Sequence, residues 1–207
     1  MCPPSAQIAS AGWPPWTAAS TGNRQRQAAW RAQGRGGRQN SDMRLVLTAD
    51  THVPRRSRDV PEMLWHAIDA ADVVVHAGDW VDESLLDAMS ARSRRLIGVY
   101  GNNDGTAVRS RLPEVARAEI AGLRMAVVHE TGPKEGRERR CVARFGDCDL
   151  LVFGHSHIPW DTVAAGGLRL INPGSPTDRR AQPHATFITA RVTNGELTDV
   201  VLHRLPR

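Results

Sequence analysis

The sequence is poor in cysteine and has no long hydrophobic segment. Its three cysteines, Cys2, Cys141 and Cys148, are too few and too widely spaced among 207 residues for a disulfide framework or a thiolate zinc site. No apolar run approaches the roughly 18 residues of a membrane-spanning helix, and the N-terminus lacks the continuous apolar segment of a secretion signal. We therefore expect a soluble, cytoplasmic protein without a membrane partner.

Acidic residues are almost absent from the first 42 residues. This segment holds five arginines and one acidic residue, Asp42, and so carries +4 of the formal net charge of +5. It is rich in Pro, Gly, Ala, Gln and Arg without apolar periodicity, which predicts a disordered N-terminal extension over residues 1–42. Residues 43–207 hold 22 basic and 21 acidic side chains, so we expect one domain with little affinity for nucleic acid.

Short apolar runs alternate with amphipathic segments through the first part of this domain. The runs at residues 44–49, 73–76, 95–100, 125–128 and 149–153 are typical of buried strands, and residues 61–71 and 83–92 are typical of helices. Near the C-terminus, residues 185–192 and 197–205 flank Asn194-Gly195, a strong hairpin signal. The pattern predicts an α/β fold in which antiparallel strands extend or stack on a mostly parallel sheet.

Residues of metal-ligand type stand at the end of each predicted parallel strand. In chain order they are Asp50 with His52, Asp79, Asn102, His129, and His155 with His157. Sites in open α/β sheets form outside the carboxyl ends of the strands, so these side chains are expected to converge. Seven candidates are too many for one ion, whereas two divalent ions about 3.5 to 4 Å apart, with a shared carboxylate, would use all of them.

Each motif alone also has a simpler explanation. A strand-end aspartate is often a cap, and His76 lies within an apolar run, so we interpret it as a core residue or one that supports a ligand. The segments 101–105 and 172–175 are both typical of tight turns. Turns and caps do not explain ligand residues at five successive strand ends, and this favours the metal-site hypothesis.

The order and spacing of these motifs resemble the calcineurin-like metallophosphoesterases, and within them the small single-domain phosphodiesterases of bacteria and archaea. The resemblance implies a sandwich of two β-sheets flanked by helices, in the layer order α-β-β-α. It also implies which residues would hold each metal. Asp50, His52, Asp79 and His157 would bind one ion, and Asp79, Asn102, His129 and His155 the other, with Asp79 bridging.

Two positions depart from the common pattern of that family. Asn103 stands where many members have a histidine that acts as general acid, and an amide donates a hydrogen bond but delivers no proton. We keep Asn103 as a candidate substrate-binding residue. Glu130 follows His129 at a position where glycine is common. Its carboxylate would either alter the affinity of the second metal or point into solvent, and we favour solvent.

Taken together, the motifs and the resemblance predict a dinuclear phosphodiesterase, a hydrolase in which a metal-bridging hydroxide attacks a small phosphodiester. Asp79, Asn102 and His129 are the expected catalytic residues. The ligand types suit Mn, Fe, Ni, Co or Zn, and the resemblance favours manganese. Two dications, two ligand carboxylates and one hydroxide sum to +1, which a phosphodiester monoanion neutralises. A monoester dianion would need an added arginine, for which Arg55 and Arg56 are candidates.

Two other functions remain open at this point. The superfamily includes a retromer subunit of similar size that lacks part of the ligand set and works as a scaffold, so a non-catalytic metal-binding module is one alternative. A nuclease is the other, because the same centre hydrolyses diesters. The near-neutral domain makes nucleic acid an unlikely partner.

Overall fold

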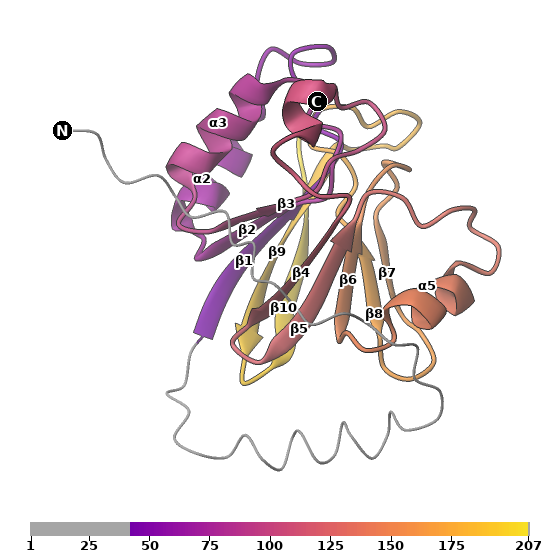
Figure 1. Ribbon diagram of the computed structural model, residues 1–207. Coiled ribbons are helices and arrows are strands. Elements are labelled where there is room, and N and C mark those ends of the chain that lie inside the picture. The colour runs from indigo at the N-terminus through magenta and orange to yellow at the C-terminus, as the bar shows by residue number, and fades with distance from the viewer. Residues whose placement is uncertain (1–41, 207) are drawn as a thin grey trace.

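Two five-stranded β-sheets pack face to face, and helices cover the outer face of each (Figure 1). The structure, a computed structural model, describes residues 42–206, so the predicted extension lies outside the described residues except for Asp42. The first sheet has the order β10-β9-β1-β2-β3, with β1 (Asp42–Thr48), β2 (Val73–His76), β3 (Leu96–Gly98), β9 (Thr186–Thr193) and β10 (Glu196–Arg204). The second has the order β4-β5-β6-β8-β7, with β4 (Val115–Ile120), β5 (Leu123–Val128), β6 (Leu150–Phe153), β7 (Trp160–Val163) and β8 (Arg169–Asn172). The predicted α-β-β-α sandwich is confirmed.

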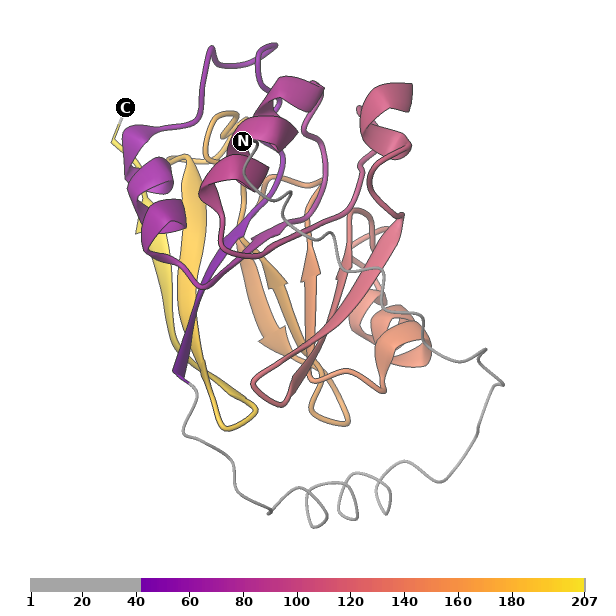
Figure 2. The ribbon, with the colours of Figure 1, turned by 60° about the vertical axis from the view of Figure 1, so that its left-hand side comes forward.

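The helices follow the sequence signals closely. The first sheet carries α2 (Glu62–Ala70) and α3 (Glu83–Arg92), within one residue of the predicted bounds, and the second carries α5 (Arg137–Phe145) (Figure 2). The α3 helix begins where the Asp82 side chain accepts a hydrogen bond of 2.9 Å from the backbone N–H of Ser84. The short α4 (Thr106–Arg109) lies at the upper end of the molecule in Figure 2.

Three apolar layers explain why the parallel strands are continuously hydrophobic. Between the sheets, Leu47 and Val75 pack with residues such as Val127 of the opposite sheet. On the other face of the first sheet, neighbours such as Val74 pack against Leu64 and other residues of α2 and α3. A strand buried on both faces has no polar side, so its sequence shows no alternation.

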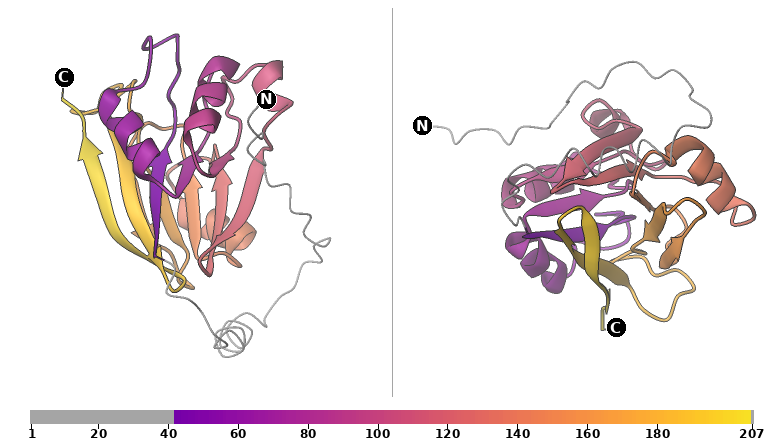
Figure 3. Two further views of the ribbon diagram at one scale, coloured as in Figure 1. Left: turned by 90° about the vertical axis from the view of Figure 1, so that its left-hand side faces the viewer. Right: turned by 90° about the horizontal axis from the view of Figure 1, so that it is seen from below.

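The direction of the strands gathers their following loops at one end. β1, β2 and β3 are parallel to one another, as are β5, β6 and β8. The loops after β1, β2, β3, β5 and β6 lie at the upper end of the sandwich in Figure 1 and in the left view of Figure 3. This end is where the predicted ligands are placed.

Hairpins complete each sheet. Asn194 and Gly195 have φ values of 53° and 82°, as a type I′ turn requires, so the predicted β9–β10 hairpin is confirmed. The β4–β5 hairpin, with Ala121 and Gly122 at φ 45° and 88°, was not predicted, nor were β7, β8 and α5.

No helix within residues 42–206 is both long and apolar enough to cross a membrane.

Candidate metal centre

The structure brings all seven predicted ligands together. Ligand atoms of Asp50, His52 and His157 lie within 4.8 Å of one another, and so do those of Asp50, Asp79 and His129. The remaining two residues join these groups through the amide oxygen of Asn102, which lies 3.0 Å from His129 Nε2 and 3.0 Å from His155 Nδ1. The residues come from five loops that are far apart in the sequence.

His157 anchors the first group. Its Nδ1 donates to the carbonyl oxygen of Asp178 at 2.5 Å, so Nε2 carries an unprotonated lone pair. That Nε2 lies 3.2 Å from His52 Nε2 and 3.4 Å from Asp50 Oδ1. Burial lowers the pKa of His157 to about 4, so the imidazole is neutral and available as a ligand near pH 7.

His129 anchors the second group in the same way. Its Nδ1 lies 2.8 Å from the carbonyl oxygen of Ala77, which directs Nε2 toward Asn102 and toward Asp79 Oδ2 at 3.4 Å. The same Oδ2 atom lies 3.5 Å from His52 Nε2. Asp79 therefore stands between the two groups, where the resemblance had placed a bridging carboxylate.

The chemistry of these atoms fits cations. Two imidazole nitrogens and one carboxylate oxygen meet in the first group, and an imidazole nitrogen, an amide oxygen and a carboxylate oxygen meet in the second. Burial raises the pKa of Asp50 to about 8, and the charge of Asp79 adds to the rise while that of His129 opposes it. Although burial opposes it, the carboxylates of Asp79 and Asp50 raise the pKa of His129 to about 8. Protons thus occupy places that divalent cations would fill.

The backbone is strained at five of the seven ligands. Asp50, His52, Asp79, His155 and His157 have φ values of 55°, 45°, 62°, 70° and 59°. Left-handed backbone costs an L-residue roughly 1 to 2 kcal/mol, and such strain concentrates at functional sites. The sequence gives no sign of it, because glycine and asparagine are the residues expected at these angles.

Glycines beside the ligands leave room for the carboxylates. A Cβ at Gly101 would overlap the carboxylate of Asp79, and a Cβ at Gly154 would lie 2.9 Å from Asp50 Oδ2. Real Cβ atoms almost never approach other atoms so closely. The glycine that precedes Asn102 and the one that precedes His155 are therefore parts of the site.

Asp104 is a site residue that sequence reasoning missed. Its carboxylate accepts three backbone hydrogen bonds, from the N–H groups of Gly101 (2.7 Å), Asp79 (3.1 Å) and Val81 (2.6 Å). It thereby joins the loop that carries Asp79 to the loop that carries Asn102. In the segment 101–105 the sequence had given roles only to Asn102 and Asn103.

The segment 172–175 is more than a turn. Asn172 Nδ2 donates to the carbonyl oxygen of Gly154 at 2.8 Å, and Ser175 Oγ donates to that of Asp50 at 2.7 Å. Gly174 takes φ 77°, as expected of the glycine in this motif. The segment therefore fixes the loop of His155 and His157 against the loop of Asp50.

His76 supports the site without facing it. Its Nδ1 accepts from the N–H of Gly78 at 3.2 Å, its Nε2 lies 3.0 Å from Thr51 Oγ1, and its ring stacks on Trp80 with 3.5 Å between centroids. Burial lowers its pKa well below the usual value, so it stays neutral. This agrees with our interpretation of His76 as a core or supporting residue.

Asn103 and Glu130 lie closer to the ligands than the sequence indicated. Asn103 donates to Asp79 through both its amide Nδ2 (2.7 Å) and its backbone N–H (2.9 Å). Glu130 is exposed to solvent, as expected, but it is not remote from the centre. Its side chain is half-exposed, but Oε1 lies 3.3 Å from His155 Nδ1, and Glu130, His129 and His155 form a third group of candidate ligands.

The sequence of this chain is similar to known proteins. A family model described as the calcineurin-like phosphoesterase superfamily domain matches residues 43–195. A probable metallophosphoesterase of Methanothermobacter thermautotrophicus is 30% identical over 168 residues, which are 78% of this chain and 92% of that protein. One of Methanocaldococcus jannaschii is 29% identical over 138 residues, 65% of this chain and 69% of that protein.

Solved structures show the same fold. A Thermotoga maritima protein determined by solution NMR has a TM-score of 0.64 at 29% identity, with 79% of this chain and 99% of that chain covered. Vps29 of Entamoeba histolytica, crystallised in complex with Zn²⁺, has a TM-score of 0.63 at 22% identity and shares the fold over 79% of this chain and 98% of its own. Together with the family match over residues 43–195, these findings show that the chain belongs to the calcineurin-like phosphoesterase superfamily.

Proposed function

We propose that this protein is a dinuclear metal-dependent phosphodiesterase. Its family indicates a metal-dependent hydrolase of phosphoric esters. The observation that supports a dinuclear site is the position of Asp79 Oδ2, 3.5 Å from His52 and 3.4 Å from His129, between two groups of ligand atoms. The first ion would be held by Asp50, His52, Asp79 and His157, and the second by Asp79, Asn102, His129 and His155.

Bound divalent ions would neutralise phosphate charge and make a water acidic enough to attack near neutral pH. The protein's own contribution is to orient the ligands. The Asp178 and Ala77 carbonyls fix the tautomers of His157 and His129, and Asp104 fixes the loops of Asp79 and Asn102. We propose manganese as the native ion on the basis of the family resemblance, since the imidazole, amide and carboxylate ligands suit Mn, Fe, Ni, Co or Zn alike.

Asn103 is proposed to contact the substrate or the bridging carboxylate, without acting as an acid. Its amide donates to Asp79 and has no proton to transfer. Reaction therefore depends on a leaving group that departs without protonation, such as a phenolate.

The test is a metal titration of chelated protein with bis(4-nitrophenyl) phosphate as substrate. Hydrolysis is expected to reach its maximum at two equivalents of Mn²⁺ per chain, with binding followed in parallel by calorimetry. Maximal activity at one equivalent would refute the dinuclear mechanism. Two bound equivalents with no hydrolysis of any phosphate ester would support the scaffold alternative, and faster cleavage of duplex DNA than of the aryl diester would support the nuclease.

A further inference from the structure

His155 lies between two side chains of opposite charge that the proposed reaction has not used. Glu130 Oε1 lies 3.3 Å from its Nδ1, and Arg180 Nη1 donates to its carbonyl oxygen at 3.3 Å. Glu130 follows β5 and Arg180 follows the segment 172–175, so the fold brings a carboxylate and a guanidinium to the same edge of the metal centre.

Arg180 is held in place with most of its donors unused. Its backbone has φ 50°, and its N–H donates to Asp178 Oδ1 at 3.3 Å. Among residues 42–206, no carboxylate lies within ion-pair distance of the Arg180 guanidinium. The guanidinium N–H groups make one hydrogen bond within this range, to the carbonyl oxygen of His155. A guanidinium offers five such groups in a planar fork that matches phosphate oxygens.

The positive charge of Arg180 affects the pKa values of nearby ligands. It opposes the rise that burial gives to the pKa of Asp50, and it adds to the fall that burial gives to the pKa of His52 and of His157. These effects place the guanidinium within electrostatic range of the first group of ligands.

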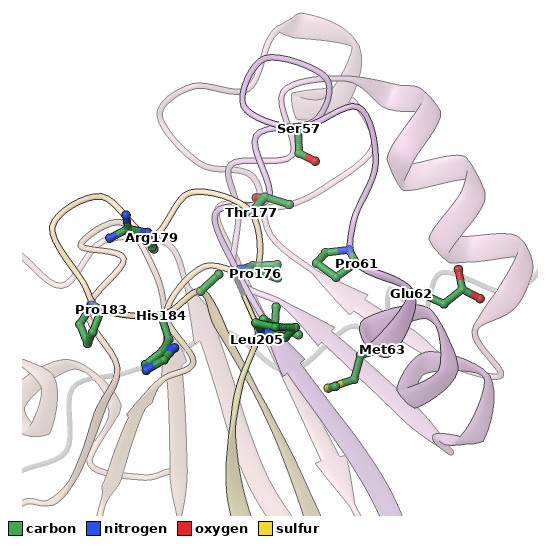
Figure 4. Close-up of a pocket in the computed structure, with 12 residues that line it drawn as sticks. Ser57, Pro61, Glu62, Met63, Pro176, Thr177, Arg179, Pro183, His184 and Leu205 are labelled. Atoms are coloured by element: carbon green, nitrogen blue, oxygen red, sulfur yellow. The ribbon is translucent and has the colours of Figure 1, made fainter.

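Neighbouring arginines are engaged elsewhere. Arg56, which the sequence suggested as a phosphate ligand, pairs with Asp178 at 3.3 Å. Arg179 donates to the carbonyl oxygen of Gln182 at 2.6 Å and lines a cavity of about 510 Å³ together with Ser57 and other residues (Figure 4). Arg179 and Arg180 are therefore adjacent, both exposed, and different in what they contact.

The two side chains also change the charge balance of the site in opposite directions. Two dications, two ligand carboxylates and one hydroxide sum to +1. Glu130 subtracts one charge and Arg180 adds one, so the sum stays at +1 while positive and negative charge become separated in space. A phosphodiester monoanion matches that sum, whereas the second charge of a monoester would face the carboxylate of Glu130.

We propose that Arg180 binds a non-bridging oxygen of the substrate phosphate and that Glu130 disfavours phosphate dianions, so that this pair sets the preference for diesters over monoesters. The proposal rests on the proposed phosphodiesterase function. It assigns specificity to two residues outside the predicted ligand set.

The experiment compares wild type, Arg180→Met, Glu130→Gln and the matched control Arg179→Met, each with two Mn²⁺ bound as checked by metal analysis. For bis(4-nitrophenyl) phosphate, Arg180→Met is expected to lower kcat/KM roughly 10- to 100-fold, mainly through KM, as for loss of one charge-assisted hydrogen bond. Glu130→Gln is expected to raise kcat/KM for 4-nitrophenyl phosphate about tenfold relative to the diester. Arg179→Met is expected to stay within about twofold of wild type, because losing an exposed charge away from the site has little effect.

Calorimetric titration with inorganic phosphate at pH 8 separates this proposal from the proposed function. If neither the wild type nor any variant hydrolyses an ester, the proposed phosphodiesterase function is refuted. Even then, phosphate affinity is expected to fall in Arg180→Met and to rise in Glu130→Gln. Equal phosphate affinities in Arg180→Met and Arg179→Met would overturn the role of Arg180. An unchanged monoester-to-diester ratio and unchanged phosphate affinity in Glu130→Gln would overturn the role of Glu130.

Discussion

Metal binding by this protein is expected to release protons from two of the seven ligands. At pH 7 the metal-free centre holds a proton on Asp50, whose burial raises its pKa to about 8, and one on His129, whose pKa is also about 8 despite burial. The other ligands have nothing to release. Burial lowers the pKa of His52, His155 and His157, and hydrogen bonds from His129 and Asn103 outweigh burial in lowering that of Asp79.

The magnitude follows from these values. A group with a pKa of about 8 is about nine-tenths protonated at pH 7, but a protonated Asp50 no longer raises the pKa of His129. The coupled pair is therefore expected to release between about one and about 1.8 protons at pH 7 and at most about 0.2 at pH 9. Each released proton weakens apparent metal binding by about 1.4 kcal/mol for each pH unit below 8. Affinity is therefore expected to rise steeply up to about pH 8 and to level off above it.

Calorimetry of Mn²⁺ binding in buffers of different ionisation enthalpy counts these protons directly. Asp50→Asn provides the internal comparison, because it removes one titrating ligand and the charge that helps to raise the pKa of His129, so it is expected to lower the release at pH 7 by at least about one proton. Release of no protons at pH 7, or equal release by wild type and Asp50→Asn, would refute the electrostatic reasoning.

Three further predictions address the geometry of the centre. Asp79→Ala is expected to reduce bound metal from two ions to one or none, because two cations would face each other without a shared carboxylate; metal analysis showing two ions at wild-type affinity would contradict the bridging role. Gly101→Ala is expected to weaken metal binding at least tenfold, because its Cβ would displace Asp79, whereas Gly105→Ala, whose Cβ meets no atom within 4 Å, is expected to bind metal as wild type does in the same titration. Asn103→His is expected to increase kcat/KM for alkyl diesters more than for aryl diesters, by up to about 10²-fold, and an unchanged ratio would show that position 103 does not face the leaving group.

The ligands were predictable because their positions follow from local rules. A buried parallel strand is visible as an apolar run, and its carboxyl end is where sites form, so residues such as Asp79 and His129 could be assigned without any three-dimensional information. Asp104 could not be assigned in that way, because its partners Gly101, Asp79 and Val81 meet only after two loops have docked.

The α5 helix was missed for a physical reason. Only Cys141 and Phe145, with part of Arg137, form the buried face of α5, and Arg137 lies against the rings of Phe153 and Trp160 at 5.1 and 4.8 Å from their centroids. When the aliphatic part of an arginine forms part of a helix's buried face, the helix has too few apolar residues for its sequence to show helical periodicity. Whether such a segment is helical depends on its tertiary contacts.

The left-handed backbone at five ligands bears on how the superfamily could diverge. A glycine at any of these positions would relieve roughly 1 kcal/mol of strain, and at Asp50 it would also remove a buried carboxylate. Once selection for hydrolysis is relaxed, this strain favours replacement of the ligand residues, whereas the packing and hydrogen bonds of a buried side chain such as His157 oppose it. The sandwich itself, built from apolar layers that contain no ligand, would persist through that loss. Relief of backbone strain therefore favours loss of ligand residues in this architecture, and this chain has residues of ligand type at all seven positions.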